Sequence, residues 1–424
     1  MRKIDGSYQY DWVTIAIYYA LVFIGWISIY ASTYNTASDY SMFSLDINSG
    51  RQLVWIATSI FLVLAILLID FRFYETFSYL SYLIITLLLL IVLIFAREVD
   101  GAKSWLEIGP AKIQPSEFAK FTTGLALAKF LGSTGGKDLS KPKNLVISFG
   151  IIGLSAVLIL LQGDAGSAMV FGALILVLYR EGLSPIPLYA GLYLAVLFIT
   201  SLLVQNLILV IALSIIALVL IGLAIRRPQR LLMTVIIWVM SLGFIFSVDF
   251  IMNDVLKPHQ RQRVLALVDP SVDPTGKGVS YQTTNSKITI GSGGLAGKGF
   301  LQGSLTQGDF VPAQSTDFIF STIGEEYGWF GSVVLIGLFI TLFFRLIQLA
   351  ERQKSVFARV YGYVVFTVLF FHFTLNIAMV IGLFPVIGIP LPFLSYGGSS
   401  LWSFTILLFI FLKLDAHRMQ ILQR

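Results

Sequence analysis

Ionisable side chains able to do chemistry gather in two polar stretches, and the first spans residues 97–120. Lys103 and Trp105 lie in its GAKSWLEIGPAKIQPSEFAK segment, and Glu117 and Lys120 follow one helical turn apart. A Trp-anchored turn at a membrane surface would explain this composition without any chemistry. Glu117 and Lys120 argue against that interpretation, because ionisable groups at a membrane entrance are costly and usually face a cavity.

The second polar stretch, 252–315, contains two carboxylates and two cations within thirteen positions of one another. Arg261 and Arg263 precede Asp269 and Asp273, and each aspartate is followed by proline. A carboxylate can take a proton from an attacking hydroxyl, and a cation can stabilise an anionic leaving group. Asp-Pro pairs also form turns, so the cap of a bend explains either carboxylate equally well.

The glycine-rich stretch of the second polar loop, GSGGLAGKGF, runs from Gly291 to Phe300 and is similar in composition to a phosphate-binding loop. Ser292 occupies the first glycine position of that motif, and Lys298 is followed by Gly299 where the motif requires serine or threonine. The stretch is therefore not predicted to bind a nucleotide phosphate.

Polar residues also lie at the ends of apolar runs. Asp164, in the LQGDAGSA turn, is explained as a cap of the following helix, and Ser315, Thr316 and Asp317 precede an apolar run as a helix N-terminus would. The pair Glu325-Glu326 lies farther along that run. A carboxylate buried there needs a partner, because burial near mid-membrane costs about 2.5–3.5 kcal/mol.

The last connection, GLFPVIGIPLPFLSYGGSS from Gly382 to Ser400, is interrupted by three prolines, so a regular helix cannot continue through it. Irregular backbone at membrane depth is tolerated where it packs in protein or lines a cavity. The sequence is compatible with the border of a lipid-binding groove and equally with a passive re-entrant plug.

The elements that must position these residues are apolar helices. The chain has 424 residues, of which 57% are hydrophobic and 12% charged, and no soluble core could absorb that apolar surface. Runs of about 20 apolar residues are long enough to cross the bilayer. Such runs occur at residues 12–31, 52–70, 77–96, 117–132, 145–162, 166–181, 185–204, 206–225, 231–252, 317–346, 357–383 and 399–414.

The fold class predicted from these runs is an all-α integral membrane protein. We expect a polytopic bundle of about 12 transmembrane helices with a large extracytoplasmic loop, forming a single domain over residues 1–424. The first run is longer than the core of a signal peptide and is expected to remain as an anchor. An even number of spans places both termini on one side.

Orientation follows from the distribution of basic residues, which favours the cytoplasmic side of membranes. With the N-terminus inside, the short outer loops carry only Arg51, and the two polar loops face outward. The inner segments then carry Arg2, Lys3, Arg72, Lys137, Lys141, Lys143, Arg180, Arg226, Arg227, Arg230, Arg352, Lys354, Arg359, Lys413, Arg418 and Arg424.

Several function classes are excluded by composition. The net charge of +6 arises from basic residues scattered at helix ends, so nucleic acid is not an expected partner. The chain has no cysteine, which excludes disulfides and thiol chemistry. Its three histidines, His259, His372 and His417, are too widely spread for a zinc site.

Together the polar motifs carry a resemblance. The chain resembles the SEDS family of peptidoglycan glycosyltransferases, and is more similar to its cell-elongation members than to its cell-division members. No motif is specific alone, but the set extends from the first polar loop to the last helix. The matching stretches are GAKSW, IQPSEFAK, LQGDAGSA, HQRQRV, LVDPSVDPTGKGVSYQ, GSGGLAGKGF, KGFLQGSLTQ, FVPAQSTDFIFSTIGEEYG and PVIGIPLPFLSYGGSS.

The resemblance implies an enzyme that polymerises glycan strands from lipid II in the bacterial inner membrane, with a class B penicillin-binding transpeptidase as partner. It singles out Asp273, which matches the family's essential aspartate. Three departures affect the local backbone: Ser104 replaces a basic residue, Gly163 interrupts the Gln-Pro-Asp turn, and extra residues follow Gly276. Family members have about ten spans, so the helix pair 185–225 is interpreted as an insertion.

The chemistry implied is an inverting transfer with Asp273 as the general base. Cations or a divalent metal, Mg or Mn, would stabilise the diphosphate leaving group, and no permanently bound cofactor is expected. Lys287 and Lys298 are weaker candidates for that role. The residues expected to contact lipid II and the growing lipid-linked glycan are Arg51, Lys103, Trp105, Glu117, Lys120, Asp164, Arg261, Arg263, Gln282, Ser315, Thr316, Asp317, Ser395, Tyr396 and Ser399.

Two other functions are compatible with the sequence. A flippase or transporter of the same lipid-linked precursor would place ionisable residues through the full membrane depth, whereas here the polar chemistry is concentrated on one side. A non-catalytic scaffold for a transpeptidase would need the same helices and no base.

Overall fold

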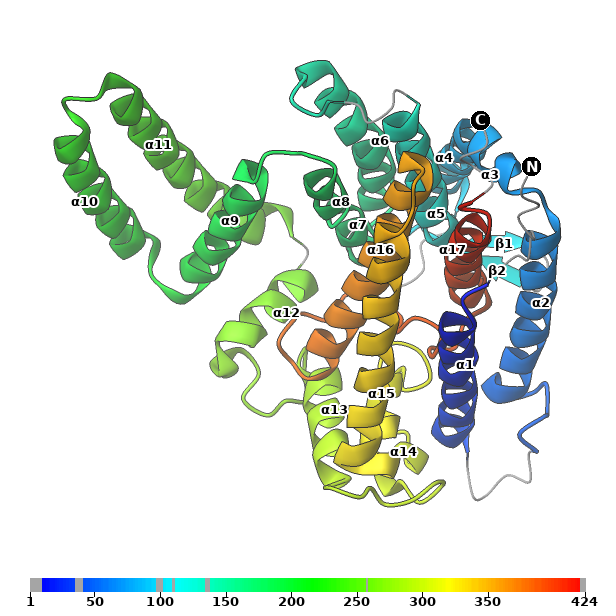
Figure 1. Ribbon diagram of the computed structural model, residues 1–424. Helices are drawn as coiled ribbons and strands as arrows, with labels where there is room; N and C mark the ends of the chain where they lie inside the picture. The colour runs from blue at the N-terminus through cyan, green and yellow to red at the C-terminus, as the bar shows by residue number, and fades with distance from the viewer. Residues whose placement is uncertain are drawn as a thin grey trace, which may run out of the picture. The chain divides into compact units, whose positions relative to one another are not determined.

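The computed structural model describes residues 10–34, 41–96, 102–108, 111–133, 138–256 and 258–419 (Figure 1). The predictions made for Arg2, Lys3, Arg97, Gly101, Lys137 and Arg424 lie outside this range. Two compact units can be distinguished, unit 1 at residues 1–183 and 285–424, and unit 2 at residues 184–284. The prediction of one domain over the whole chain stays a prediction.

Unit 1 contains most of the helices. They are α1 (Trp12–Thr33), α2 (Asn48–Leu68), α3 (Phe71–Thr76), α4 (Ser78–Phe95), α5 (Pro115–Gly132), α6 (Pro142–Leu161), α7 (Ala165–Gly172), α8 (Ile175–Arg180), α14 (Ser304–Gln307), α15 (Ile319–Glu351), α16 (Val356–Val380) and α17 (Gly398–Ala416). Helix α13 (Tyr281–Ser292) begins in unit 2 and continues into unit 1.

The predicted membrane spans are confirmed as helices. Within the described residues, ten helices are long and apolar enough to cross a membrane, so the chain is a multi-pass membrane protein. The two remaining predicted spans correspond to α5, which carries Glu117, Lys120 and Lys129, and to α7 and α8. The run 166–181 was predicted as one helix, but the α-helix is interrupted between Gly172 and Ile175.

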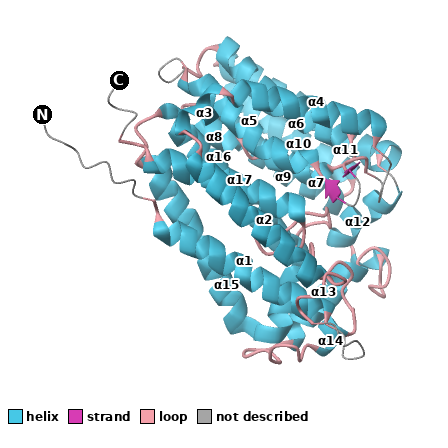
Figure 2. Ribbon diagram, turned by 90° about the vertical axis from the view of Figure 1, so that its right-hand side faces the viewer, coloured by secondary structure: helices cyan, strands magenta, loops and turns pink. Residues whose placement is uncertain are grey.

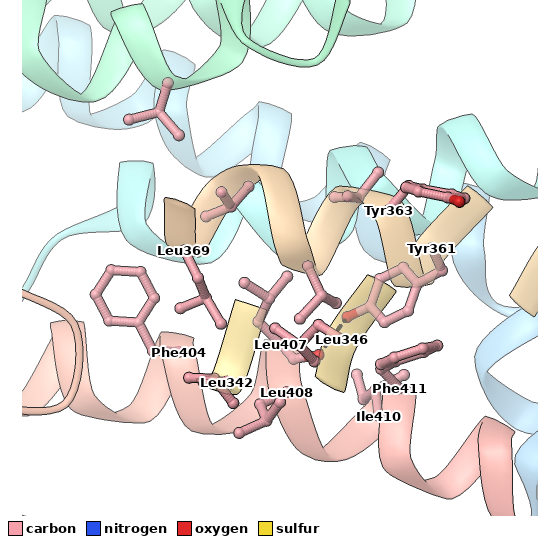
Figure 3. Packing of buried hydrophobic residues seen from close by; sticks show 14 of the residues in the cluster. Leu342, Leu346, Tyr361, Tyr363, Leu369, Phe404, Leu407, Leu408, Ile410 and Phe411 are labelled. Atoms are coloured by element: carbon pink, nitrogen blue, oxygen red, sulfur yellow. Dashed lines mark hydrogen bonds between the residues drawn. The ribbon is translucent and has the colours of Figure 1, made fainter. Parts of the chain in front are cut away.

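The core of unit 1 is formed around α5, α16 and α17. Helix α5 packs against α4, α6, α16 and α17, and α15 packs against α1 and α16. Figure 3 shows how side chains of α15, α16 and α17 interlock, with the Tyr361 hydroxyl donating to the Leu407 carbonyl oxygen at 3.2 Å. Gly124 allows the close approach of α5 to α16, because an added Cβ would lie 2.6 Å from Val364 Cγ1.

At the end of unit 1 where α1 begins, ion pairs join the helices to one another. Each pair connects different segments of the chain, so the helix ends are fixed laterally as well as by packing. The pairs are Arg345 with Asp11, Arg352 with Asp415, Arg180 with Glu351, and Arg359 with Glu181. These arginines include three of those predicted for the inner loops.

Unit 2 contains three apolar helices, α9 (Ile186–Leu203), α10 (Asn206–Ala224) and α11 (Pro228–Phe250). A π-helix (Ile251–Val255), α12 (Pro258–Val268) and a 3-10 turn (Pro270–Val272) follow. The run 185–225 is therefore two separate helices. Polar bridges join all three long helices: Tyr193 with Ser241 at 2.8 Å, Trp238 with Ser214 at 3.3 Å, and Asn206 with Asp249 at 3.2 Å.

The first polar loop contains a short antiparallel hairpin that was not predicted. Strands β1 (Leu106–Ile108) and β2 (Ala111–Ile113) pair Leu106 with Ile113 and Ile108 with Ala111 (Figure 2). Apolar residues alternate with Glu107 and Lys112, which is the pattern of a half-buried strand. Pro115 then begins α5 at its first turn, as expected for proline.

Helix α15 is broken at Gly328, whose φ of 62° and ψ of −154° are open only to glycine. An added Cβ at Gly328 would lie 2.3 Å from the backbone nitrogen of Gly297. The two chain segments therefore pass each other at backbone contact. This proximity explains the glycine-rich stretch Gly291–Phe300, here called the glycine segment.

The glycine segment supplies the backbone hydrogen bonds that the break in α15 removes. The bonds are Lys298 N to Glu325 O at 3.0 Å, Gly299 N to Glu326 O at 2.9 Å, Trp329 N to Gly294 O at 2.9 Å and Phe330 N to Leu295 O at 3.2 Å. Carbonyls before the break and amides after it are thereby satisfied, as a low-polarity environment requires.

We predict that Gly328→Ala destabilises the protein by at least about 1–3 kcal/mol, because alanine is strained in this conformation and collides with Gly297. Gly337→Ala, in the same helix, is the control, since no heavy atom lies within 4 Å of its added Cβ. That variant should be neutral or slightly stabilised. Thermal denaturation in detergent, followed by tryptophan fluorescence, compares the two. Equal midpoints would refute the role of the break.

Candidate functional site

A polar cluster in unit 1 is organised around Asp164, at the start of α7. Its Oδ1 accepts the backbone N–H of Ser167 at 2.9 Å, which confirms the predicted helix cap. Its Oδ2 accepts Gln114 Nε2 at 2.9 Å and Ser116 Oγ at 3.3 Å. The carboxylate thus joins the start of α7 to the start of α5.

Asp317 is half-buried close to Asp164. Burial and the charge of Asp164 raise the pKa of the Asp317 carboxyl to about 6. Its backbone oxygen accepts Asn376 Nδ2 of α16 at 2.7 Å. The prediction that residues 315–317 cap α15 is wrong, because the N-cap is Phe318 and no side chain caps it.

Residues 315–317 instead pair with the irregular connection between α16 and α17. The backbone N–H of Tyr396 donates to the Ser315 oxygen at 2.9 Å, and Ser395 Oγ donates to the Thr316 oxygen at 2.6 Å. Ser399 accepts the N–H of Gln114 at 3.3 Å. The predicted break in helix is confirmed there, and the connection packs against the segment that carries Asp317.

Glu117 and Lys120 form a buried ion pair on α5, with Lys120 Nζ 2.6 Å from Glu117 Oε1 and side-chain exposures of 3% and 1%. Lys120 Nζ also lies 5.0 Å from the centre of the Phe404 ring. Glu117 Oε2 has no hydrogen-bond partner among the described residues. Such a pair inside a membrane protein is costly, which favours a functional role over a structural one.

Four polar residues of unit 1 were not predicted as site residues from the sequence: Gln114, Ser116, His372 and Asn376. His372 and Asn376 lie one turn apart on α16 and are buried, and the His372 ring contacts the Phe404 ring with centres 4.8 Å apart. Their signal was available, because histidine and asparagine inside the apolar run 357–383 are expensive to bury without a role.

Unit 2 holds the second group of predicted residues, including Asp273. Asp273 Oδ2 accepts the backbone N–H groups of Ser280 and Gly278, each at 3.0 Å. These bonds lower the pKa of the carboxyl, and the bond from Ser280 has the larger effect. Asp269 accepts the N–H of Ser271 at 2.9 Å. Both aspartates therefore organise turns, and Asp273 closes a wider loop than Asp269.

The candidate cations differ in what surrounds them. Arg51 is exposed and donates to the Leu45 backbone oxygen at 2.9 Å, and Lys298 pairs with Glu325 at 2.5 Å. Arg261 borders a hollow of about 310 Å³ in unit 2. That hollow is also lined by Asn253, Leu256, Pro258, Gln262 and Leu265.

The remaining predicted residues differ in their exposure and contacts. Lys103 is exposed, and its backbone N–H donates to the Gln162 oxygen at 2.7 Å. Trp105 and Gln282 are half-buried, and Arg263 is exposed. The predicted partner for Glu325-Glu326 is confirmed, because Glu325 binds Lys298 and also accepts Thr306 N at 2.8 Å.

A divalent cation finds few protein ligands in the described part of the chain. No group of three or more acidic, histidine or cysteine side chains there could hold a metal ion. Asp164 and Asp317 offer two carboxylates, so a cation bound to them would need oxygen ligands from the substrate as well.

These helices and polar clusters define a multi-pass membrane protein with its ionisable chemistry concentrated in a few loops and helix ends. The sequence profile of the cell cycle proteins FtsW, RodA and SpoVE matches residues 11–203 and 180–420. The chain belongs to this family, in agreement with the resemblance carried by its motifs.

Curated relatives include the peptidoglycan glycosyltransferase RodA of Treponema pallidum, 30% identical over 98% of this chain and 100% of that protein. MrdB of Escherichia coli, also named a peptidoglycan glycosyltransferase, is 33% identical over 83% of this chain and 81% of that protein. A probable FtsW of Shewanella sediminis is 27% identical over 98% of this chain and 89% of that protein.

A solved structure described as "Structural coordination of polymerization and crosslinking by a peptidoglycan synthase complex" contains a similar chain. Its TM-score is 0.69 at 26% identity, over 97% of this chain and 99% of that chain. The predicted helical membrane fold is thereby confirmed, with the short β1–β2 hairpin as its one departure among the described residues.

Replacing Lys120 with methionine should destabilise the protein by about 3–5 kcal/mol, because Glu117 would remain buried without its cation. The double variant Lys120→Met, Glu117→Gln should recover most of this loss, since no charge is left unpaired. Thermal denaturation in detergent measures both. A double variant as unstable as the single one would show that the ion pair is not the cause.

Asp317→Asn should stabilise the protein at neutral pH by about 1–3 kcal/mol. The folded pKa is raised, so the unmodified protein loses stability as the pH rises from the ordinary value of 3.8 to about 6. The variant should lack this loss. Midpoints of thermal denaturation between pH 4 and pH 7 test the sign. Parallel pH profiles for both proteins would contradict the assignment.

Proposed function

We propose that this peptidoglycan glycosyltransferase polymerises lipid II into glycan strands by an inverting transfer, with Asp273 as the general base. A sugar hydroxyl of one lipid-linked substrate attacks the anomeric carbon of the other. The hydroxyl proton passes to Asp273, the bond from carbon to the phosphate oxygen breaks, and the lipid diphosphate leaves with the electron pair.

The observation that carries this proposal is the environment of the Asp273 carboxylate. Two backbone N–H groups bind Oδ2 and orient the carboxylate, which is ionised at neutral pH and can therefore accept a proton. We assign proton uptake to Oδ1, which neither N–H group holds. Asp269 has one such bond and closes only a short turn.

The departing diphosphate needs positive charge, because charge develops on it as the bond breaks. We assign this role to Arg261 and Arg263 in unit 2, and to Lys103 and Lys120 in unit 1. Arg51 is a further candidate, and Lys287 and Lys298 are weaker ones; Lys298 already pairs with Glu325. Mg or Mn bound through substrate oxygens would supply the same stabilisation.

We place the protein in the bacterial inner membrane with both termini in the cytoplasm and the two polar loops outside. The distribution of lysine and arginine supports this orientation. The solved structure that contains a similar chain is described as a peptidoglycan synthase complex that coordinates polymerisation and cross-linking, which supports a class B penicillin-binding transpeptidase as partner.

Asp273→Asn should lower the rate of polymerisation by about 10²–10⁴, the usual contribution of a general base. Asp269→Asn is the matched control, because asparagine can still cap the Ser271 turn, and its activity should be unchanged. The rate is measured with purified protein in detergent that is supplied with lipid II, by following the glycan products and their lengths over time. A flippase would yield no polymer, and equal activity of the two variants would refute the assignment.

A further inference from the structure

Four large apolar side chains are exposed in the two segments that meet where α15 is broken, and one of them, Phe300, also lies beside Tyr30 of α1 with ring centres 6.5 Å apart. Leu295 and Phe300 of the glycine segment are 70% and 41% exposed, and Trp329 and Phe330 of α15 are 56% and 59% exposed. We call these four residues the apolar tip. Several large apolar side chains exposed in neighbouring segments mark a contact with another apolar phase or partner.

The apolar tip is fixed at one level along α15. Trp329 donates its backbone N–H to the Gly294 oxygen at 2.9 Å, and Phe330 donates to the Leu295 oxygen at 3.2 Å. Because the glycine segment is hydrogen-bonded to the helix on both sides of Gly328, it cannot slide along α15 without losing these bonds. Whatever surrounds Trp329 therefore also surrounds Leu295.

The length of α15 shows which phase that is. The helix has 33 residues and is about 50 Å long, whereas the hydrocarbon layer needs about 20 residues. Arg345 pairs with Asp11 at the start of α1 and marks one boundary of the span. The break at Gly328, near Glu325, lies 17 positions before Arg345, at the short end of the range that crosses the hydrocarbon layer, and tryptophan is typical of such a boundary.

The apolar tip continues the exposed apolar side of α15. Val333, Val334, Ile340 and Phe344 are 44%, 61%, 45% and 64% exposed and recur at helical spacing from Trp329 and Phe330. Lys298, the cation within the glycine segment, does not oppose insertion, because its ammonium group binds Glu325 at 2.5 Å and Ser304 at 3.0 Å.

We propose that the apolar tip inserts into the bilayer leaflet beside the second polar loop, with Leu295 and Phe300 among the lipid chains near the headgroups. This contact would hold α14 and the unit 1 part of α13 at the membrane surface. It does not depend on which carboxylate is the base. The occupant is lipid, because the surface extends that of the membrane span itself.

The absence of cysteine from the sequence allows a direct test by single-cysteine labelling. Leu295→Cys is compared with Val334→Cys, on the lipid-facing side of α15, and with Gln302→Cys, an exposed polar position of the same loop. Each full-length variant carries a nitroxide in vesicles of phosphatidylethanolamine and phosphatidylglycerol. Relaxation by oxygen and by a water-soluble nickel chelate reports the phase around each label.

We expect the label at position 295 to have an oxygen-to-nickel ratio close to that at 334 and far above that at 302. Phe300→Cys gives an independent reading. A fluorophore attached at position 295 should be quenched more strongly by lipids labelled near the headgroup than by lipids labelled deep in the chain. A label at 295 as accessible to nickel as that at 302 would overturn the proposal. So would a label shielded from both reagents, which would indicate contact with protein instead.

Discussion

Inside a bilayer no water satisfies polar groups, so every backbone amide, carbonyl and charge must find its partner within the protein. This constraint explains the least regular parts of the structure. At Gly328 the helical hydrogen bonds of α15 fail, and the glycine segment replaces them. Between α16 and α17 the irregular backbone pairs with residues 315–317. Each irregular segment is held by another part of the chain. The connection between α16 and α17 lies in the polar cluster organised around Asp164.

Local hydrogen bonding and burial give the carboxylates of this protein different properties. Backbone N–H groups stabilise the charged form of Asp273 and lower its pKa, whereas burial beside Asp164 raises that of Asp317. Glu325 is fully occupied by Lys298 and the loop around Thr306. Local surroundings thus give these three carboxylates different roles. Asp273 is ionised and can accept a proton, Asp317 holds a proton more tightly, and Glu325 stabilises the structure.

Membership in the family of FtsW, RodA and SpoVE gives these groups a common setting. The family profile matches in two segments that overlap at residues 180–203, a stretch that includes α9, the first helix of the pair interpreted as an insertion. That pair belongs to unit 2 together with Asp273. Helices α9 and α10 are joined to α11 by polar side chains, and the interpretation of this pair as an insertion stays a prediction.

The helices could be predicted from the sequence, because the length of an apolar run is read directly from composition. The cap at Asp164 and the helix start at Pro115 followed from local chemistry. The sequence by itself could not choose Asp273 over Asp269, which only the family resemblance did. Tertiary structure decided what Asp317 and the glycine segment do. Their partners, Asn376 and Gly328, are distant in sequence, and the need to satisfy buried polar groups acts through space, so no local pattern records it.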